Sequence, residues 1–365
     1  MDGRERFQRT MHYQGVDRAP MIEVGFWSEA RKRWLREGMP EGVEDALTFS
    51  GCEFFGLDAQ RCIGLNLGMM PPFEAEVVCE DERTVTHRNV EGVLMRAMKD
   101  GSSMPQFLSW PVRTRDDFVP IKRRYDPTTP ERYPQDWEAL IAWAPTRDCP
   151  LWGPGIGSVG FYSMLRRWMG TENACTVFYD DPALAEEMLE LVADFTIAAM
   201  ERALREVQLD YFMWWEDFAF KNGPLVSPAI FERFLAPCYR RVNDAIRRSG
   251  TDVIFVDSDG NPSVLLRLML EAGVNGTYPI EAAAGMDPVQ LRREFGRDLL
   301  LWGGVDKRAL TRDRRAIDEE LRAKLPPLLA EGGYIPQLDH MAPPDIPYDN
   351  WLYYLELKRR MLEGN

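Results

Sequence analysis

The chain carries little positive charge for its size. Its 365 residues contain 44 Lys and Arg against 58 Asp and Glu, which gives a formal net charge of −14. Proteins that bind nucleic acid need clustered basic residues to neutralise phosphate groups. The acidic excess therefore excludes a nucleic-acid partner and disfavours binding to an anionic membrane surface.

Long hydrophobic stretches are also missing. No apolar run approaches the roughly 20 residues that a transmembrane helix needs. The sequence begins Met1-Asp2-Gly3-Arg4 without an apolar segment behind it, so no secretory signal is visible. We expect a cytoplasmic protein that does not enter a membrane.

Paired cysteine motifs and nucleotide-binding motifs are absent as well. The six cysteines are scattered without CxxC spacing, so we expect reduced thiols rather than disulfides or a structural zinc site. Glycines between residues 153 and 160 follow a short apolar run, but they lack GxGxxG spacing and no GK[ST] is present. The sequence does not favour a nucleotide site.

The sequence does contain short apolar runs that alternate with helical sequence. Such runs are typical of buried parallel strands in βα units. They begin near Met21, Phe54, Leu151, Tyr211, Val253, Val274, Leu299 and Tyr334. A chain of 365 residues is a normal length for one barrel with insertions. We therefore predict an α/β fold, a (β/α)8 TIM barrel that forms a single domain over residues 1–365.

Two segments lie outside this pattern. Residues 4–14 read as an amphipathic helix ended by Gly15, which predicts an N-terminal helical extension. Within residues 66–100, short alternating runs are separated by Asn, Gly and acidic turns, which predicts an antiparallel β-meander inserted into the barrel. Residues 100–135 are rich in Pro, Arg and Asp, and we expect loop with a short helix there.

Acidic residues follow most of the later predicted strands. They are Glu216, Asp217, Asp257, Asp259, Glu281, Asp306 and Asp339, with His340 after the last. On a barrel these strand ends meet at one mouth. So many carboxylates around one mouth raise one another's pKa unless a cation is present.

Two kinds of cation could compensate this charge. One is a divalent metal, for which Asp257, Asp259 and His340 would supply ligands, and zinc is the metal we expect. The other is a cationic substrate held against aromatic rings. The candidate rings are Trp27, Trp214, Trp215 and Trp302.

A third explanation needs neither a metal nor a cationic substrate. Some of the acids could cap helices or pair with Arg166, Lys221 or Lys307. Lys221 could equally bind a substrate carboxylate, and the sequence leaves these alternatives open.

Several segments resemble the uroporphyrinogen decarboxylase superfamily over nearly the whole chain. They are Arg4-Glu-Arg-Phe, Asp17-Arg-Ala-Pro20, Trp215-Glu-Asp, Gly223-Pro-Leu-Val-Ser-Pro228, Asp257-Ser-Asp-Gly-Asn261, Glu271-Ala-Gly-Val-Asn, Glu281-Ala-Ala-Ala-Gly-Met-Asp287, Leu301-Trp-Gly-Gly-Val-Asp306-Lys, Gly332-Gly-Tyr-Ile-Pro and Asp339-His340. The superfamily includes the decarboxylase and methyltransferases such as methylcobalamin:coenzyme M methyltransferase. The resemblance implies a (β/α)8 barrel with its active cleft at the strand carboxyl ends.

The chain departs from the decarboxylases at the positions that matter for their chemistry. Phe26–Arg31 stands where they carry an early basic motif, and Leu65 falls where their catalytic aspartate would lie. Their cleft tyrosine aligns with Arg166, and only His340 has a clear counterpart. An acidic mouth would also oppose a polycarboxylate porphyrinogen. These departures disfavour porphyrinogen decarboxylation.

The methyltransferases of the superfamily bind zinc, and the resemblance places Asp257, Asp259 and His340 at the corresponding positions. We therefore predict methyl transfer on a small molecule, aided by a metal and linked to a corrinoid on a partner protein. Proposed catalytic residues are Glu216, Asp217, Glu281 and His340; proposed substrate-binding residues are Trp27, Arg166, Trp215, Lys221, Asp306 and Lys307.

Two alternatives are kept. One is decarboxylation of uroporphyrinogen or another acid, and the other is a non-catalytic barrel that binds a cationic or methylated ligand. The resemblance also leads us to expect a homodimer.

Overall fold

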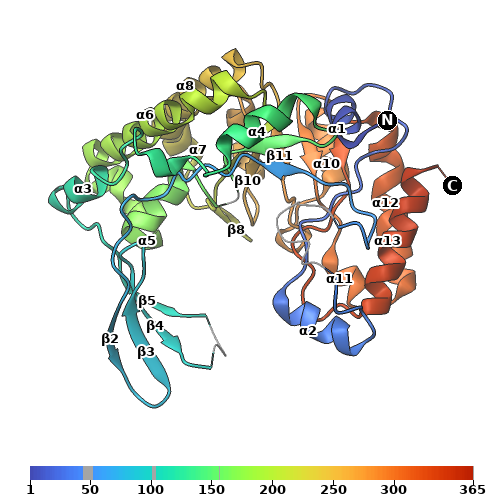
Figure 1. Cartoon of the computed structure of the whole chain (residues 1–365), viewed down its shortest axis with the longest axis horizontal. Helices are drawn as coiled ribbons and strands as arrows, with labels where there is room; N and C mark the ends of the chain where they lie inside the picture. Colours follow the sequence, from blue (N-terminus) through green and yellow to red (C-terminus); the bar gives the residue numbers. More distant parts are fainter. Residues whose placement is uncertain (44–51, 101–103, 156, 365) are drawn as a thin grey trace.

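A curled sheet of seven parallel strands forms the centre of the computed structural model, which describes residues 1–43, 52–100, 104–155 and 157–364 (Figure 1). Its strands, in spatial order, are β1 (Arg61–Cys62), β6 (Leu151–Gly153), β7 (Tyr211–Trp215), β10 (Ile254–Asp257), β11 (Gly276–Tyr278), β12 (Leu300–Trp302) and β13 (Tyr334–Ile335). Spatial order follows chain order, as expected for successive βα units. The sheet is consistent with the predicted TIM-like barrel.

Side chains on these strands alternate between two hydrophobic clusters. Tyr211, Met213 and Phe255 belong to the inner cluster, together with Trp302. Phe212, Trp214, Ile254 and Val256 point outward into the cluster beneath the helices. Both faces are buried, which explains why these strands are apolar at nearly every position rather than at every second one.

The helices lie outside the sheet. The longer ones are α5 (Phe161–Asp180), α6 (Pro182–Glu206), α8 (Ala236–Arg248), α10 (Pro288–Phe295), α12 (Arg314–Glu331) and α13 (Tyr348–Leu362). Short helices are α7 (Pro228–Ile230), α9 (Leu266–Glu271), α11 (Lys307–Leu310), the π-helix Phe231–Leu235 and the 3-10 turns Ser263–Leu265 and Ala282–Ala284. A two-stranded hairpin, β8 (Ala219–Phe220) with β9 (Gly223–Pro224), follows β7.

The N-terminal segment bridges the two sides of the curled sheet. The backbone N–H of Asp58 donates to the Met21 carbonyl at 2.8 Å, and that of Ala342 donates to the Gly25 carbonyl at 3.0 Å. Helices α1 (Gly3–Met11) and α2 (Ser28–Arg36) flank this segment, and the predicted N-terminal helix is thereby confirmed. In α1, Phe7 packs against the ring of Tyr211 at 5.0 Å, so this helix closes the amino end of the sheet.

A buried ion pair anchors the same segment to the last helix. The Lys358 Nζ on α13 lies 2.6 Å from a Glu23 carboxylate oxygen, and Tyr354 also donates to Glu23. The other Glu23 oxygen accepts from the backbone N–H of Leu338 at 3.1 Å. Glu23 therefore fixes the loop that carries His340 relative to the N-terminal segment.

A separate antiparallel sheet projects from the body of the molecule (Figure 1). It consists of β2 (Glu76–Glu80), β3 (Thr84–Arg88), β4 (Leu94–Met98) and β5 (Gln106–Ser109) in sequential order. The predicted meander is thus present, and it extends past residue 100 because β5 completes it. The connection back to β6 contains α3 (Arg115–Lys122), the 3-10 turn Pro130–Arg132, α4 (Trp137–Trp143) and the 3-10 turn Ala144–Thr146.

Two sequence predictions about strands were wrong. Residues 54–58 form a turn closed by a bridge between Cys52 and Leu57, and the strand comes later, at Arg61–Cys62. Residues 21–25 lie in the place of a strand but have no regular ladder; Phe26 forms a single parallel bridge with Ala342. A short apolar run indicates that a segment is buried, but it does not show whether the buried segment is a strand or a loop.

Candidate functional site

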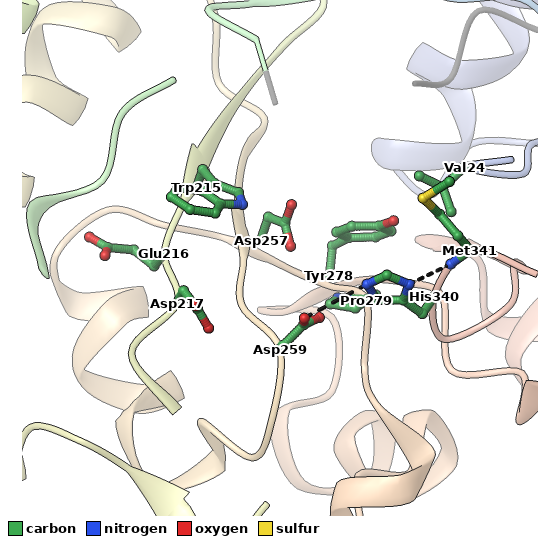
Figure 2. A pocket seen from close by; sticks show the side chains of 10 residues that line it. All are labelled: Val24, Trp215, Glu216, Asp217, Asp257, Asp259, Tyr278, Pro279, His340 and Met341. Atoms are coloured by element: carbon green, nitrogen blue, oxygen red, sulfur yellow. Dashed lines mark hydrogen bonds and ion pairs between the residues drawn. The ribbon is translucent and has the colours of Figure 1, made fainter. Parts of the chain in front are cut away.

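A small cavity opens at the carboxyl ends of the parallel strands (Figure 2). Its volume is about 210 Å³. It is lined by Val24, Trp215, Glu216, Asp217, Asp257, Asp259, Tyr278, Pro279, His340 and Met341. We call it the acidic cavity, because the described residues that line it include carboxyl groups but no lysine or arginine.

Strand alternation explains why these residues meet. On β7, Trp215 follows Tyr211 and Met213 at intervals of two, and on β10 Asp257 follows Phe255 in the same way. Side chains two residues apart on a strand point to the same face. Trp215 and Asp257 therefore lie on the same inner face as the aromatic core, at the carboxyl ends of their strands.

Asp257 lies at the floor of the acidic cavity with its carboxyl directed into the open space (Figure 2). Within the described residues no hydrogen bond to its side chain is found, although its backbone carbonyl accepts from the Glu216 N–H at 2.7 Å. Burial raises the pKa of Asp257 well above its usual value, and the nearby carboxylates of Asp259 and Asp217 raise it further. The protonated form of Asp257 is therefore favoured compared with that of an exposed aspartate.

Asp259 and His340 form a pair across the cavity. The His340 Nε2 lies 3.7 Å from the Asp259 carboxylate, and its Nδ1 accepts the backbone N–H of Met341 at 2.8 Å. Because Nδ1 accepts a hydrogen bond, the ring proton is assigned to Nε2, which faces Asp259. Burial raises the pKa of Asp259, while His340 opposes this shift and Glu281 adds to it.

Trp27 contacts the outer side of the site at His340, although it is not among the described residues that line the acidic cavity. The two rings are stacked, with centroids 6.1 Å apart and planes at 5°. Trp27 is 46% exposed, so one face is available at the surface while the other supports the imidazole. The two other tryptophans predicted for an aromatic wall, Trp214 and Trp302, are fully buried in the core and do not line the cavity.

Glu216 serves the fold at the edge of the cavity. Its carboxylate accepts the backbone N–H groups of Phe161 at 2.5 Å and Ser163 at 3.0 Å, at the N-terminus of α5, and the Tyr239 hydroxyl at 2.5 Å. Burial raises the pKa of Glu216 to about 7, and these donors lower it in part. Since the helix terminus and Tyr239 occupy its oxygens, Glu216 holds α5 against β7.

Asp217 lies at the boundary between the acidic cavity and a second one. Its carboxylate forms an ion pair with Arg166 on α5, and its backbone N–H donates to the Ser163 hydroxyl at 2.8 Å. The Arg166 Nη1 also donates to the Asp217 carbonyl at 2.5 Å. Arg166 thus pairs with an acid at the strand ends, as the capping and pairing explanation allowed, and its predicted role in substrate binding stays a prediction.

The second cavity, of about 320 Å³, lies between α5 and the antiparallel sheet. It is lined by Asn89, Glu91, Val93, Phe107, Trp110, Ser163, Arg166, Arg167, Thr171, Trp215 and Asp217. We call it the arginine cavity. It shares Trp215 and Asp217 with the acidic cavity, so the two adjoin at the end of β7.

Lys307 and Asp306 do not line the acidic cavity. The Lys307 Nζ lies 3.2 Å from the fully buried Asp339, whose other oxygen accepts the Ala282 N–H at 3.0 Å. Asp306 caps α11 and binds Arg308 over a separate surface hollow. Both residues behave as the capping and pairing explanation expected.

Glu281 and Lys221 likewise lie outside the lining. Glu281 accepts the backbone N–H of Gly260 at 2.8 Å, and this bond supports the loop that carries Asp259. Lys221 is exposed in the turn between β8 and β9. Glu281 therefore positions a cavity residue, whereas Lys221 is placed at the surface.

The predicted metal ligands come together only in part. Asp257, Asp259 and His340 all line the acidic cavity. Across the described ranges, however, no group of three or more His, Cys, Asp or Glu side chains is arranged so that it could hold a metal ion. As far as the described residues show, Asp257, Asp259 and His340 are not arranged as a preformed zinc site.

Sequence reasoning missed Tyr278, Arg167 and Met341. Tyr278 ends β11 on its inner face, and burial raises the pKa of its hydroxyl well above the usual value, so it remains a neutral polar group. Asp257 is predicted to line the site because it lies at the carboxyl end of a parallel strand. Tyr278 lies at the end of the next strand, so the same reasoning predicts it once uncharged residues are considered. No sequence signal links Arg167 to the site, because its position depends on the antiparallel sheet.

The curled parallel sheet and the cavity at its carboxyl end are typical of α/β enzymes of the TIM-barrel class, whose active sites lie at that end of the strands. The uroporphyrinogen decarboxylase (URO-D) family model matches residues 98–361, and the chain belongs to this family. A methyltransferase from Methanosarcina mazei is similar in structure, with a TM-score of 0.62 over 99% of each chain and 14% sequence identity. No curated protein matches the chain. No helix within the described residues is both long and apolar enough to span a bilayer.

Proposed function

We propose that this chain is a methyltransferase that removes a methyl group from the oxygen or nitrogen of a small molecule, with Asp257 as the general acid. The observation that carries the proposal is the Asp257 carboxyl at the floor of the acidic cavity, without a hydrogen-bond partner among the described residues. The similar fold of a methyltransferase supports the reaction class.

The size of the cavity favours a small substrate. An apolar cavity of about 150 Å³ holds one benzene molecule. The acidic cavity, at about 210 Å³, therefore accepts a group only a few atoms larger. A porphyrinogen contains four pyrrole rings with their side chains and is far too large to enter it.

The charge of the acidic cavity also argues against a porphyrinogen substrate. A substrate carboxylate needs a cationic partner when it leaves water. The described lining of the acidic cavity contains acids and no lysine or arginine, so the reacting end of the substrate is neutral or cationic. Trp215 and Tyr278 present aromatic surface to such a group. The acidic lining therefore disfavours decarboxylation inside the acidic cavity.

The chemistry requires one proton when the substrate is a neutral ether or amine, whereas an ammonium group leaves as a neutral amine without it. A soft nucleophile, such as the thiolate of a second substrate, attacks the methyl carbon with its electron pair. The bond from that carbon to oxygen or nitrogen breaks, and its electron pair stays on the heteroatom. Asp257 donates its proton to this heteroatom, which makes it a better leaving group. Asp257 ends the step as a carboxylate and is protonated again by solvent.

Asp259 and His340 act on the substrate from the opposite wall. The imidazole ring is held by the Met341 N–H and by stacking on Trp27, so its orientation is set before the substrate binds. Together with Asp259 it places a polar surface opposite Asp257. We propose that this pair orients the heteroatom toward the acid.

The methyl acceptor approaches from the mouth. The acceptor that the sequence predicts is a corrinoid on a partner protein. A corrinoid ring is too large for a cavity of about 210 Å³, so it would reach the substrate only from outside.

We also propose that the barrel is a closed (β/α)8 barrel in which residues 21–26 take the place of the eighth strand. The zinc ion, the homodimer and the cytoplasmic location also stay predictions.

The test compares wild type with Asp257→Asn. Proton NMR follows loss of the methyl signal from a panel of small N-methyl and O-methyl compounds, in the presence of a thiol or a reduced corrinoid. We expect turnover by wild type and a loss of about 10² to 10⁴-fold in the variant. The matched control is Asp244→Asn, which removes the same charge from an exposed position on α8.

Three further results would overturn the proposal. They are an unchanged rate in Asp257→Asn, formation of coproporphyrinogen from uroporphyrinogen, and ligand-induced stabilisation without turnover of any methyl compound. The last would favour a non-catalytic binding barrel. Metal analysis of protein purified without chelator, compared with an Asp257→Ala/Asp259→Ala variant, tests the zinc prediction separately.

A further inference from the structure

The two cavities at the end of β7 differ in charge, because the arginine cavity holds two arginines beside Glu91 and Asp217, whereas the described lining of the acidic cavity has acids without a lysine or arginine. The acidic cavity is lined by Asp257 and Asp259, and the arginine cavity by Arg166 and Arg167. Trp215 lines both and forms their common wall. A single ligand that passes Trp215 would therefore meet acids at one end and guanidinium groups at the other.

Both arginines keep donor groups for a ligand. Among the described residues, Arg166 uses its Nε toward Thr171 and its Nη1 toward Asp217. Arg167 uses Nη2 toward the Gly157 carbonyl, and its Nε lies 3.8 Å from Glu91. The Arg166 Nη2 and the Arg167 Nη1 take no part in these contacts. Each of these two nitrogen atoms can donate a charge-assisted hydrogen bond to a carboxylate oxygen.

The arginines are held in place by aromatic and backbone contacts. The Arg167 guanidinium lies over the Trp215 ring at 4.6 Å from its centroid. A guanidinium fixed in this way loses little side-chain entropy when an anion binds. The position of Arg167 on the shared wall also directs it to any ligand that crosses between the cavities.

The antiparallel sheet supplies the apolar side of the arginine cavity. Phe107 and Trp110 are stacked at 6.0 Å, and both line it. Trp110 packs directly on Gly170 of α5, where an added Cβ would lie 2.6 Å from the indole ring. This contact fixes the sheet against α5 and gives the cavity a rigid hydrophobic wall beside its two cations.

We propose that the arginine cavity binds the anionic end of the substrate whose methylated end occupies the acidic cavity. The substrate class is a small molecule with a methyl-bearing nitrogen or oxygen at one end and a carboxylate at the other, joined by an apolar spacer. The assignment of the methylated end rests on the proposed function, whereas binding of the carboxylate rests on Arg166, Arg167 and the shared wall alone.

The test uses ligands matched in shape and different in charge. γ-(Dimethylamino)butyrate is compared with γ-(dimethylamino)butyramide, and γ-methoxybutyrate with γ-methoxybutyramide, by isothermal titration calorimetry. We expect wild type to prefer each carboxylate over its amide by roughly tenfold, which corresponds to about 1.4 kcal/mol. The nitrogen and oxygen pairs show which heteroatom the acidic cavity accepts.

Arg167→Met is expected to remove this preference and leave amide binding unchanged. The matched control, Arg205→Met, removes the same charge from a side chain that is 66% exposed on α6 and far from the lining of both cavities. Asp257→Asn is expected to abolish methyl loss while the carboxylate preference persists. The two variants thus separate failure of the inference from failure of the proposed reaction.

Equal affinity of wild type for carboxylate and amide would overturn the inference and leave the methyltransferase proposal standing. A preference that persists in Arg167→Met would overturn it as well, since the carboxylate would then bind elsewhere. No heat of binding from any of the four compounds would contradict both proposals. Circular dichroism of each variant confirms that it is folded.

Discussion

The Asp217 carboxylate lines both cavities and forms an ion pair with Arg166, which lines only the arginine cavity. The two cavities therefore share one charge, and a change at Asp217 affects both. We therefore expect a change at Asp217 to alter ligand binding in the arginine cavity.

Asp217→Asn releases Arg166 from its carboxylate partner. We expect the preference for a carboxylate ligand over its amide to rise a few fold, because Arg166 then has its full charge available for the ligand. Isothermal titration calorimetry with γ-(dimethylamino)butyrate and its amide measures this ratio. Asp259→Asn, which changes the acidic cavity alone, is the control, and a similar rise in that variant would refute the explanation.

Asp257 makes stability depend on pH. In the unfolded chain its carboxyl titrates near its usual pKa of about 3.9. The raised pKa in the folded chain means that the native state binds the proton more tightly, so stability falls as pH rises from about 4 toward the folded pKa. The slope reaches at most about 1.4 kcal/mol per pH unit.

Asp257→Asn removes this dependence. The variant and wild type are expected to be equally stable near the lower end of that range, and the variant more stable at neutral pH, by urea unfolding. Asp244→Asn, at an exposed site, keeps the wild-type profile. Parallel curves for wild type and Asp257→Asn across the range would show that Asp257 titrates normally.

Gly170 allows the antiparallel sheet to reach α5. Its φ is +78°, and an added Cβ would meet the Trp110 ring at 2.6 Å. Gly170→Ala is expected to cost about 1–3 kcal/mol more stability than Gly64→Ala, because overpacking adds to the backbone strain. Gly64 is a matched control with φ of +70° and open space around it. Equal losses of unfolding free energy in the two variants, measured by urea unfolding, would mean that the Trp110 side chain moves to accommodate the added methyl group without a loss of stability.

The Glu23–Lys358 pair is expected to behave as a buried ion pair. Both side chains are almost fully buried, so Lys358→Met leaves the Glu23 charge without its partner and costs about 3–5 kcal/mol. Glu23→Leu/Lys358→Met is expected to cost less than the sum of the two single changes. Strict additivity in a urea double-mutant cycle would contradict the pairing.

The sequence predicted the parallel sheet and its acidic end well, because buried strands and the residues after them leave a local signal. The composition of the runs that begin near Tyr211 and Val253 predicts strands with their ends at one mouth, and the structure has strands at Tyr211–Trp215 and Ile254–Asp257. The rule that side chains two apart share a face was enough to bring Asp257 and Asp259 into one cavity.

The rest of the site depends on contacts between distant segments. Arg167 on α5 lines the arginine cavity together with Phe107 and Trp110 from a distant segment, and Glu216 accepts backbone N–H groups at the N-terminus of α5. Asp306 and Lys307 follow a strand as Asp257 does, yet helix capping and the buried Asp339 hold them away from the cavity. Sequence alone does not decide between those uses of a charged side chain.

The protonation state of Asp257 at neutral pH tests the central claim most directly. Infrared difference spectroscopy of wild type against Asp257→Asn reveals whether this side chain is a carboxylic acid, through a C=O band that shifts in D₂O. The account predicts a protonated carboxyl at neutral pH that ionises only at higher pH. A carboxylate signal from Asp257 at neutral pH would contradict its role as the acid in methyl transfer.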